Sequence, residues 1–232
     1  MRLVLDHLAA YRPFWSLAAD GVFSKGIHLV SGDVGSGKST LALMMAGLRA
    51  PESGIVIPEG ITKTMLSFQF PEFHVTGLSV AEECASWGLT PDSVTRLAGI
   101  NVGNETPALS LSRGELKRLH LACILSRDYD LLLLDEPFSS LDCRGKEQVC
   151  RQISKQSRGI TVIFTHEQSI FPDITHIWEI MRGELVDCGD MPAAARRWQH
   201  APPLVKNLVS AGRIPFKLTP EGIREAACRI RG

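Results

Sequence analysis

The feature that most constrains this chain is a glycine-rich turn at residues 32–40, placed between two apolar runs of different character. The preceding run, residues 27–30 (IHLV), suits a strand, and the following run, residues 41–45 (LALMM), suits a helix. Glycines in such a turn let backbone N–H groups converge on phosphate oxygens without Cβ clashes, and the helix N-terminus adds partial positive charge. The pattern G-x-x-x-x-G-K-[ST] therefore predicts a phosphate-binding loop, or P-loop. The flanking strand and helix argue against a chance glycine-rich turn.

Each polar position of this loop has a predicted role. Lys38 would neutralise charge on the β- and γ-phosphates, and the Ser39 hydroxyl would complete the coordination shell of a Mg²⁺ ion. The predicted nucleotide-binding residues of the loop are Gly32, Asp33, Val34, Gly35, Ser36, Gly37, Lys38, Ser39 and Thr40.

Composition excludes several functional classes. With 232 residues, 44% hydrophobic and 22% charged, the chain is a globular protein of one large domain or two small ones. Lys plus Arg and Asp plus Glu are both 25, so the balance of charge predicts no nucleic-acid partner. No apolar run approaches 18 residues, so any membrane role would act through a partner. Six cysteines without a C-x-x-C pair indicate buried free thiols.

Two further strands are predicted to end in catalytic groups. Residues 131–134 are four leucines, which suit a strand buried on both faces, and Asp135 and Glu136 follow them. Ligands of parallel sheets bind at that edge, so Asp135 suits the Mg²⁺ shell and Glu136 suits a general base. A purely structural role for two adjacent carboxylates there is costly unless a cation faces them. His166 follows the apolar residues 160–165; a lone histidine is more often structural, but its shared edge with Asp135 favours function.

Two other positions remain open between a functional and a structural interpretation. Tyr11, Phe14 and Trp15 cluster before the P-loop, where an aromatic ring could stack on a nucleotide base or simply pack in a strand. Gln69 follows the apolar residues 64–68 and could contact Mg²⁺ or the attacking water, although taken alone it reads as a surface glutamine.

These patterns predict an α/β fold with a mostly parallel sheet and a small antiparallel β layer in residues 1–30. A helical subdomain at about 72–118 is inserted, with short helices at 80–88 and 91–97. Residues 177–189 read as a hairpin. We expect an ATPase domain over 1–190 and a helical tail over 191–232, whose last helix holds Ile230; the tail either lies on the core or provides a dimerisation surface.

Taken in order, these motifs resemble the ATP-binding-cassette (ABC) ATPases. The loop matches that family's Walker A motif, Gln69 its Q-loop, residues 111–115 its signature, residues 131–136 its Walker B motif, residues 140–142 its D-loop and His166 its switch histidine. Within the family, residues 68–73 (FQFPEF), the turn at 47–48 and the tail at 202–230 are similar to the energy-coupling-factor ATPases. Those proteins drive uptake of vitamins or of cobalt and nickel ions.

The resemblance implies a P-loop NTPase that hydrolyses ATP with Mg²⁺. Two subunits, identical or paralogous, would sandwich two ATP molecules, with Ser112 and Gly114 of each facing the other's γ-phosphate and Asp142 bridging the sites. Glu136 would orient water, while His166 and Gln69 would sense the γ-phosphate; Tyr11 would stack on the base, and Ser39, Gln69 and Asp135 would hold the metal. Arg113 departs from the family, which usually has glycine there.

The resemblance also implies partners and a location. The subunit would lie peripherally on the cytoplasmic face of the membrane, docked on a transmembrane coupling protein that is paired with a substrate-capture membrane protein. A P-loop small-molecule kinase is the alternative enzyme, but it leaves residues 111–115 and the paired acids unexplained. A non-transport ABC ATPase is the second alternative, although it would generally carry an insertion or second cassette.

Overall fold

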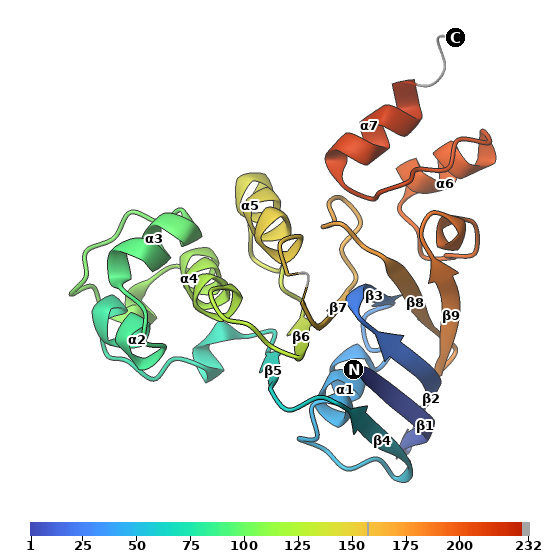
Figure 1. Cartoon of the computed structure of the whole chain (residues 1–232), viewed down its shortest axis with the longest axis horizontal. Helices are drawn as coiled ribbons and strands as arrows, with labels where there is room; N and C mark the ends of the chain where they lie inside the picture. The colour runs from blue at the N-terminus through green and yellow to red at the C-terminus, as the bar shows by residue number, and fades with distance from the viewer. Residues whose placement is uncertain (157, 229–232) are drawn as a thin grey trace.

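The computed structural model describes residues 1–156 and 158–228. Within them a single nine-stranded sheet has the order β4-β1-β2-β9-β8-β3-β7-β6-β5 (Figure 1). Its parallel part joins segments that are far apart in the sequence, because crossovers connect its successive strands. The strands of this part are β3 (Gly26–Gly32), β5 (Thr64–Ser67), β6 (Leu131–Asp135), β7 (Ile160–Thr165) and β8 (His176–Met181).

The remaining strands are antiparallel to their main neighbours. β1 (Arg2–Arg12) pairs with both β2 (Trp15–Ser24) and β4 (Ser53–Glu59), and β9 (Glu184–Asp190) pairs with β8 as the predicted hairpin. Only the Ala18–Glu184 pair joins β2 to β9. The predicted α/β fold, with a mostly parallel sheet and a small antiparallel layer, is therefore confirmed.

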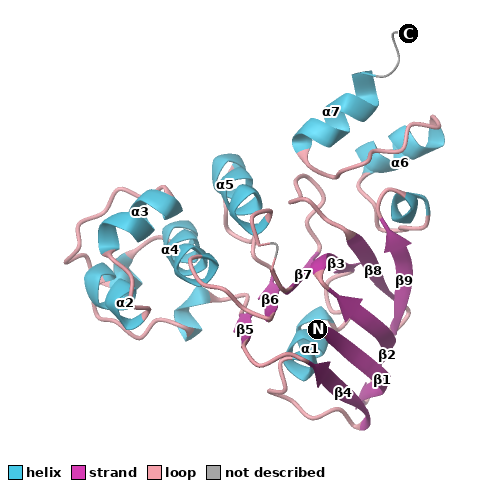
Figure 2. Ribbon diagram, in the orientation of Figure 1, coloured by secondary structure: helices cyan, strands magenta, loops and turns pink. Residues whose placement is uncertain are grey.

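Helices cover the sheet and form a separate arm (Figure 2). The arm, at the left of both views, consists of α2, α3 and α4 with the short 3-10 helices η1 and η2. The bounds are α1 (Lys38–Met45), η1 (Pro71–Phe73), α2 (Val80–Ser86), α3 (Pro91–Ala98), η2 (Ala108–Ser110), α4 (Arg113–Leu125), α5 (Cys143–Ile153), η3 (Ala193–Arg196), α6 (Pro203–Ser210) and α7 (Pro220–Cys228).

The helical arm has a small core of its own. The two short helices lie where the sequence predicts them, and the Ser79 hydroxyl caps α2 by accepting from the backbone N–H of Glu82. Val80 and Cys84 of α2 pack with Val94 of α3 and with buried residues of α4. Other residues of α4 belong to one of the two clusters on the sheet, so this helix packs against the arm and against the rest of the protein.

The central strands are buried on both faces, as the run of leucines predicts. Leu132 and Leu134 pack on one face of the sheet, while Leu131 and Leu133 pack on the other, against α1 and the antiparallel strands. Strand residues alternate between faces, so one strand supplies both cores. These buried β6 residues lead directly to Asp135, the last residue of the strand, which is also buried.

The expected C-terminal tail begins inside the main core. Ala194, Trp198 and Val205 belong to the same buried cluster as the central strands, and Met191 packs against that cluster. The boundary at residue 190 stays a prediction, as does a dimerisation role for the tail, and Ile230 lies outside the described residues. Across the described part of the chain, no helix is both long and apolar enough to span a bilayer.

Candidate functional site

The carboxyl ends of the parallel strands and the start of α1 enclose a cavity of about 340 Å³. Parallel topology brings these ends to one edge of the sheet, which is the usual position of a ligand site in such folds. The lining combines the glycine-rich loop with residues that follow β5, β6 and β7 and with the turn after β1. Its residues are Arg12, Trp15, Val34, Gly35, Gly37, Lys38, Ser39, Thr40, Gln69, Glu136 and His166.

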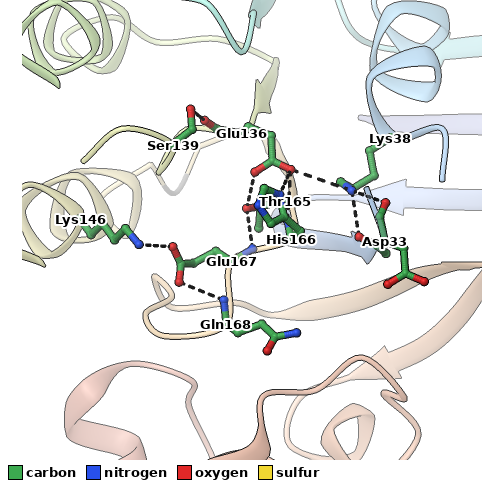
Figure 3. A network of polar contacts seen from close by, with 10 residues as sticks. Asp33, Lys38, Glu136, Ser139, Lys146, Thr165, His166, Glu167 and Gln168 are labelled. Atoms are coloured by element: carbon green, nitrogen blue, oxygen red, sulfur yellow. Dashed lines mark hydrogen bonds and ion pairs between the residues drawn. The ribbon is translucent and has the colours of Figure 1, made fainter. Parts of the chain in front are cut away.

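Lys38 occupies the centre of the phosphate-binding loop. Its Nζ donates hydrogen bonds to the carbonyl oxygens of Gly32 and Asp33, each at 2.9 Å, and lies 3.9 Å from Glu136 Oε1 (Figure 3). Burial lowers the pKa of Lys38, and the facing carboxylates of Glu136 and Asp135 oppose that shift. Two carbonyl oxygens of the loop accept hydrogen bonds from the Lys38 ammonium group. A bound nucleotide phosphate would replace them as the acceptor.

Gly37 is required at its position for two reasons. Its φ is +108°, a region that side chains rarely adopt, and a Cβ there would lie 2.3 Å from the Trp15 ring. The Trp15 indole therefore lies directly against the backbone at the start of α1. This contact brings the end of the antiparallel layer into the phosphate site.

Glu136 is buried and held at the cavity by three hydrogen bonds. It accepts from the Thr165 hydroxyl at 2.9 Å and from the backbone N–H of His166 at 3.2 Å, and its Oε1 lies 2.7 Å from His166 Nδ1. Its backbone φ of +47° is unusual for a glutamate and turns the chain sharply after β6. A carboxylate oriented by a histidine and open to a phosphate cavity has the geometry of a general base.

Asp135 lies beside the loop serine that was predicted as a metal ligand. Burial raises the pKa of the Asp135 carboxyl, while a hydrogen bond with the Ser39 side chain acts in the opposite direction. Its Oδ1 is buried without a hydrogen-bond partner, and so is the hydroxyl of Ser36. A buried carboxylate oxygen without a partner next to a hydroxyl is a donor set that fits Mg²⁺, which prefers oxygen ligands.

Gln69 lines the cavity, and its backbone is fixed by a residue of the helical arm. Lys117 of α4 is fully buried, and its Nζ donates to the carbonyl oxygens of Gln69 at 2.6 Å and Phe68 at 3.3 Å. Burial lowers the pKa of Lys117 to about 8, against the attraction of Asp135 and Glu136. A second contact between the arm and this segment is the stacking of the His120 ring on the His74 ring, whose centroids are 4.3 Å apart.

The signature residues lie outside this cavity. The Ser112 hydroxyl and backbone N–H both bond to Glu115, which forms a capping box at the start of α4. A Cβ on Gly114 would lie 2.9 Å from the Ser140 carbonyl, so glycine lets the signature approach the loop before α5. Asp142 caps α5 by accepting from Gly145 N–H at 2.8 Å, and Arg113 lies 3.9 Å from Glu72.

Tyr11 also lies outside this cavity. It is 58% exposed and lines a neighbouring cavity of about 460 Å³, whereas Arg12 and Trp15 line both. The predicted base-stacking role of Tyr11 therefore stays a prediction. Three residues of the site, Arg12, Thr165 and Lys117, were not predicted from the sequence. The one signal was the aromatic cluster that contains Trp15, and it concerns only the neighbouring Arg12.

Comparisons with known proteins agree with this geometry. The family model described as ABC transporter matches residues 22–139. The chain is 32% identical over 184 residues to the energy-coupling factor transporter ATP-binding protein EcfA1 of Thermotoga maritima, covering 70% of this chain and 71% of that protein. It is 27% identical to EcfA2 of the same organism, covering 86% of each chain. A bacterial Atm1-family ABC exporter with ATP bound shares the fold, with TM-score 0.72 and 21% identity over 86% of this chain and 41% of the exporter.

Proposed function

Because the chain belongs to the ABC transporter family and is therefore an ATPase, we propose that it is the ATP-hydrolysing subunit of an importer of the energy-coupling-factor type. In this proposal it powers uptake of a vitamin or a transition-metal ion through a membrane partner. The observation that carries the ATPase part is the convergence of Lys38, Glu136 and His166 at one cavity. The importer part is supported by the similarity to relatives named as energy-coupling factor subunits.

In the proposed reaction, some site residues bind the phosphates and others activate the attacking water. The loop N–H groups and Lys38 bind the phosphates, Glu136 accepts a proton from the attacking water, and His166 holds Glu136 in position. Gln69 lines the same cavity and would contact the γ-phosphate. Ser39 and Asp135, with Gln69, would hold Mg²⁺, which would draw charge from the β- and γ-phosphates.

A second ATPase subunit is proposed because one chain does not complete its own site. None of residues 111–115 lines the nucleotide cavity, and Ser112 and Arg113 are exposed on the arm. The start of α4 is exposed and carries the partial positive charge of a helix N-terminus, so an anion from another molecule would bind there in exchange for the Glu115 capping contacts. We therefore propose that Ser112 and Gly114 face the γ-phosphate bound by a partner subunit, a copy or a paralogue, and that Asp142 lies between the two sites.

A membrane partner is supported by apolar side chains exposed near the Q-loop. Phe73 of η1 is 75% exposed, Leu78 is 82% exposed, and Phe70 is 48% exposed. Exposed large apolar groups gathered in one segment are typical of a protein–protein contact. We propose that this segment docks on a transmembrane coupling protein, itself paired with a substrate-capture membrane protein, which places the subunit at the cytoplasmic face of the membrane.

The proposal is tested by isolating membranes from cells that express the tagged chain and identifying the polytopic proteins that copurify. We expect a coupling protein and a capture protein, lost in Phe73→Asp and Leu78→Asp. The control is Ile55→Asp on β4, which is also exposed (54%) but lies in the antiparallel layer. Copurification with no membrane protein would favour a non-transport ABC ATPase, and a phosphorylated small-molecule acceptor would favour a kinase.

A further inference from the structure

A fully buried carboxylate outside the nucleotide cavity ties the C-terminal segment to the phosphate-binding loop. Glu179 lies in the middle of β8 and has no exposed surface. It accepts hydrogen bonds from the backbone N–H of Gln199 at 3.0 Å, from the backbone N–H of His200 and from His200 Nδ1. A buried carboxylate is costly unless its oxygens are satisfied, so Glu179 fixes this short segment after η3.

His200 extends this contact to the loop itself. Its other ring nitrogen, Nε2, lies 3.4 Å from Asp33 Oδ1, so the ring stands between two carboxylates. The backbone carbonyl of Asp33 is one of the two that hold Lys38. The position of the Asp33 backbone is thus linked on one side to His200 and on the other to the central cation of the phosphate site (Figure 3 shows Asp33 and Lys38).

A second hydrogen bond from the same segment reaches the other side of Gly32. Trp198 is buried, and its Nε1 donates to the Ser31 hydroxyl at 2.7 Å. Ser31 is the penultimate residue of β3, immediately before the glycine-rich turn. Two side chains separated by one residue therefore hold Ser31 and Asp33, the neighbours of Gly32, at the point where the strand becomes the loop.

The space around these contacts adjoins the nucleotide cavity. Ser31, Asp33, Trp198 and His200 line a separate cavity of about 390 Å³, which shares His166 with the nucleotide cavity. The charged and titratable groups that face His200 are Glu179 from β8 and Asp33 from the loop, and His166 and Glu167 after β7 line the same cavity. A nucleotide in the first cavity would therefore be bound by a loop that the C-terminal segment holds from behind.

We propose that His200 is a positioning residue for nucleotide binding, which holds the phosphate-binding loop through Asp33 while Glu179 holds His200. The inference rests on the nucleotide site proposed above. Because His200 touches the loop and not the phosphates, its loss affects binding of ATP and ADP alike. It leaves the group that activates water, Glu136, in place.

The test compares nucleotide affinity and hydrolysis of the full chain with those of His200→Ala. We expect Kd for ATP and ADP, measured by calorimetric titration, and KM for ATP to rise about three- to tenfold, the range of one partly exposed charged contact, while kcat changes less than twofold. Asp33→Ala should also raise both Kd values, and since the Asp33 side chain is 83% exposed this variant removes no buried group. Asp128→Ala, which removes an exposed surface ion pair with Arg158, is the matched control and should change neither constant.

A double-variant cycle separates positioning from general stability. If His200 acts through Asp33, the double variant binds nucleotide no more weakly than Asp33→Ala alone. Additive losses, an unchanged KM in both single variants, or a fall in kcat alone would overturn the inference. Failure of the unaltered chain to bind ATP would instead overturn the proposed function.

Discussion

Replacing Lys117 with methionine is predicted to change stability and activity in opposite directions, with a dependence on pH that identifies the cause. Lys117 is 1% exposed, and burial lowers its pKa from 10.5 to about 8. The unfolded chain keeps this proton up to about pH 10.5, whereas the folded protein releases it near pH 8. The folded state therefore carries the full penalty of the buried charge below pH 8 and loses that penalty as pH rises.

The size of the Lys117 pKa shift sets the expected change in the free energy of unfolding. The difference between 10.5 and about 8 corresponds to about 3 kcal/mol of folding free energy at pH 7, and methionine removes this penalty. Methionine also removes the two hydrogen bonds to the carbonyls of Phe68 and Gln69. Their loss lowers the stability of the variant by about 1–3 kcal/mol and so offsets part of the gain. The loss of these hydrogen bonds is not part of the change in the stability difference between two pH values. Wild-type stability relative to Lys117→Met should rise by about 2 kcal/mol between pH 7 and pH 9.5.

Urea unfolding of both proteins at the two pH values measures the change, and Lys206→Met, at an exposed position of α6, is the control. ATP hydrolysis by Lys117→Met should fall about tenfold with little change in KM, because Gln69 loses the contact that holds it at the cavity. A stability difference that is the same at pH 7 and pH 9.5 would refute the reasoning on the buried charge. Unchanged hydrolysis would refute the role of Lys117 in holding the Q-loop.

Three further predictions concern the nucleotide cavity. Glu136→Gln keeps ATP binding but lowers steady-state hydrolysis about 10²- to 10⁴-fold and traps a closed dimer, measured by phosphate release and size-exclusion chromatography with ATP; undiminished hydrolysis would count against its role as the base. Lys38→Ala raises Kd for ATP about 10- to 100-fold in an equilibrium titration, since charged hydrogen bonds to phosphate are lost, and an unchanged Kd would contradict this. Asp135→Asn raises the Mg²⁺ concentration for half-maximal hydrolysis about tenfold, while an unaltered Mg²⁺ titration would remove Asp135 from the metal shell.

The fold and the central residues of the candidate site were predictable from the sequence, because they depend on local patterns and on one topological rule. The leucines before Asp135 favoured a strand buried on both faces, and the glycine-rich turn favoured a strand before it and a helix after it. The carboxyl ends of parallel strands meet at one edge. Lys38, Glu136 and His166 were therefore expected together, and the structure brings them together.

The supporting contacts were not predictable from the same patterns. Lys117 lies on α4, which is buried over most of its length, and nothing in the sequence of that helix says that its lysine points to the Q-loop carbonyls. Trp15 is the first residue of β2, and its contact with Gly37 follows from how the antiparallel layer meets α1, which no strand pattern predicts. Tyr11 lies near the end of β1 and lines a neighbouring cavity, a position that the sequence did not predict.

The sequence by itself determined the chemistry at the edge of the sheet, because strand, turn and helix preferences act over a few residues and a parallel sheet aligns their ends. Only the tertiary structure decided what holds that chemistry in position. Trp198 and His200 lie far from the P-loop in sequence, and their contacts with Ser31 and Asp33 exist because the C-terminal segment packs into the same core as β3 and β8. Packing of this kind depends on the shape of the whole molecule, which no local pattern encodes.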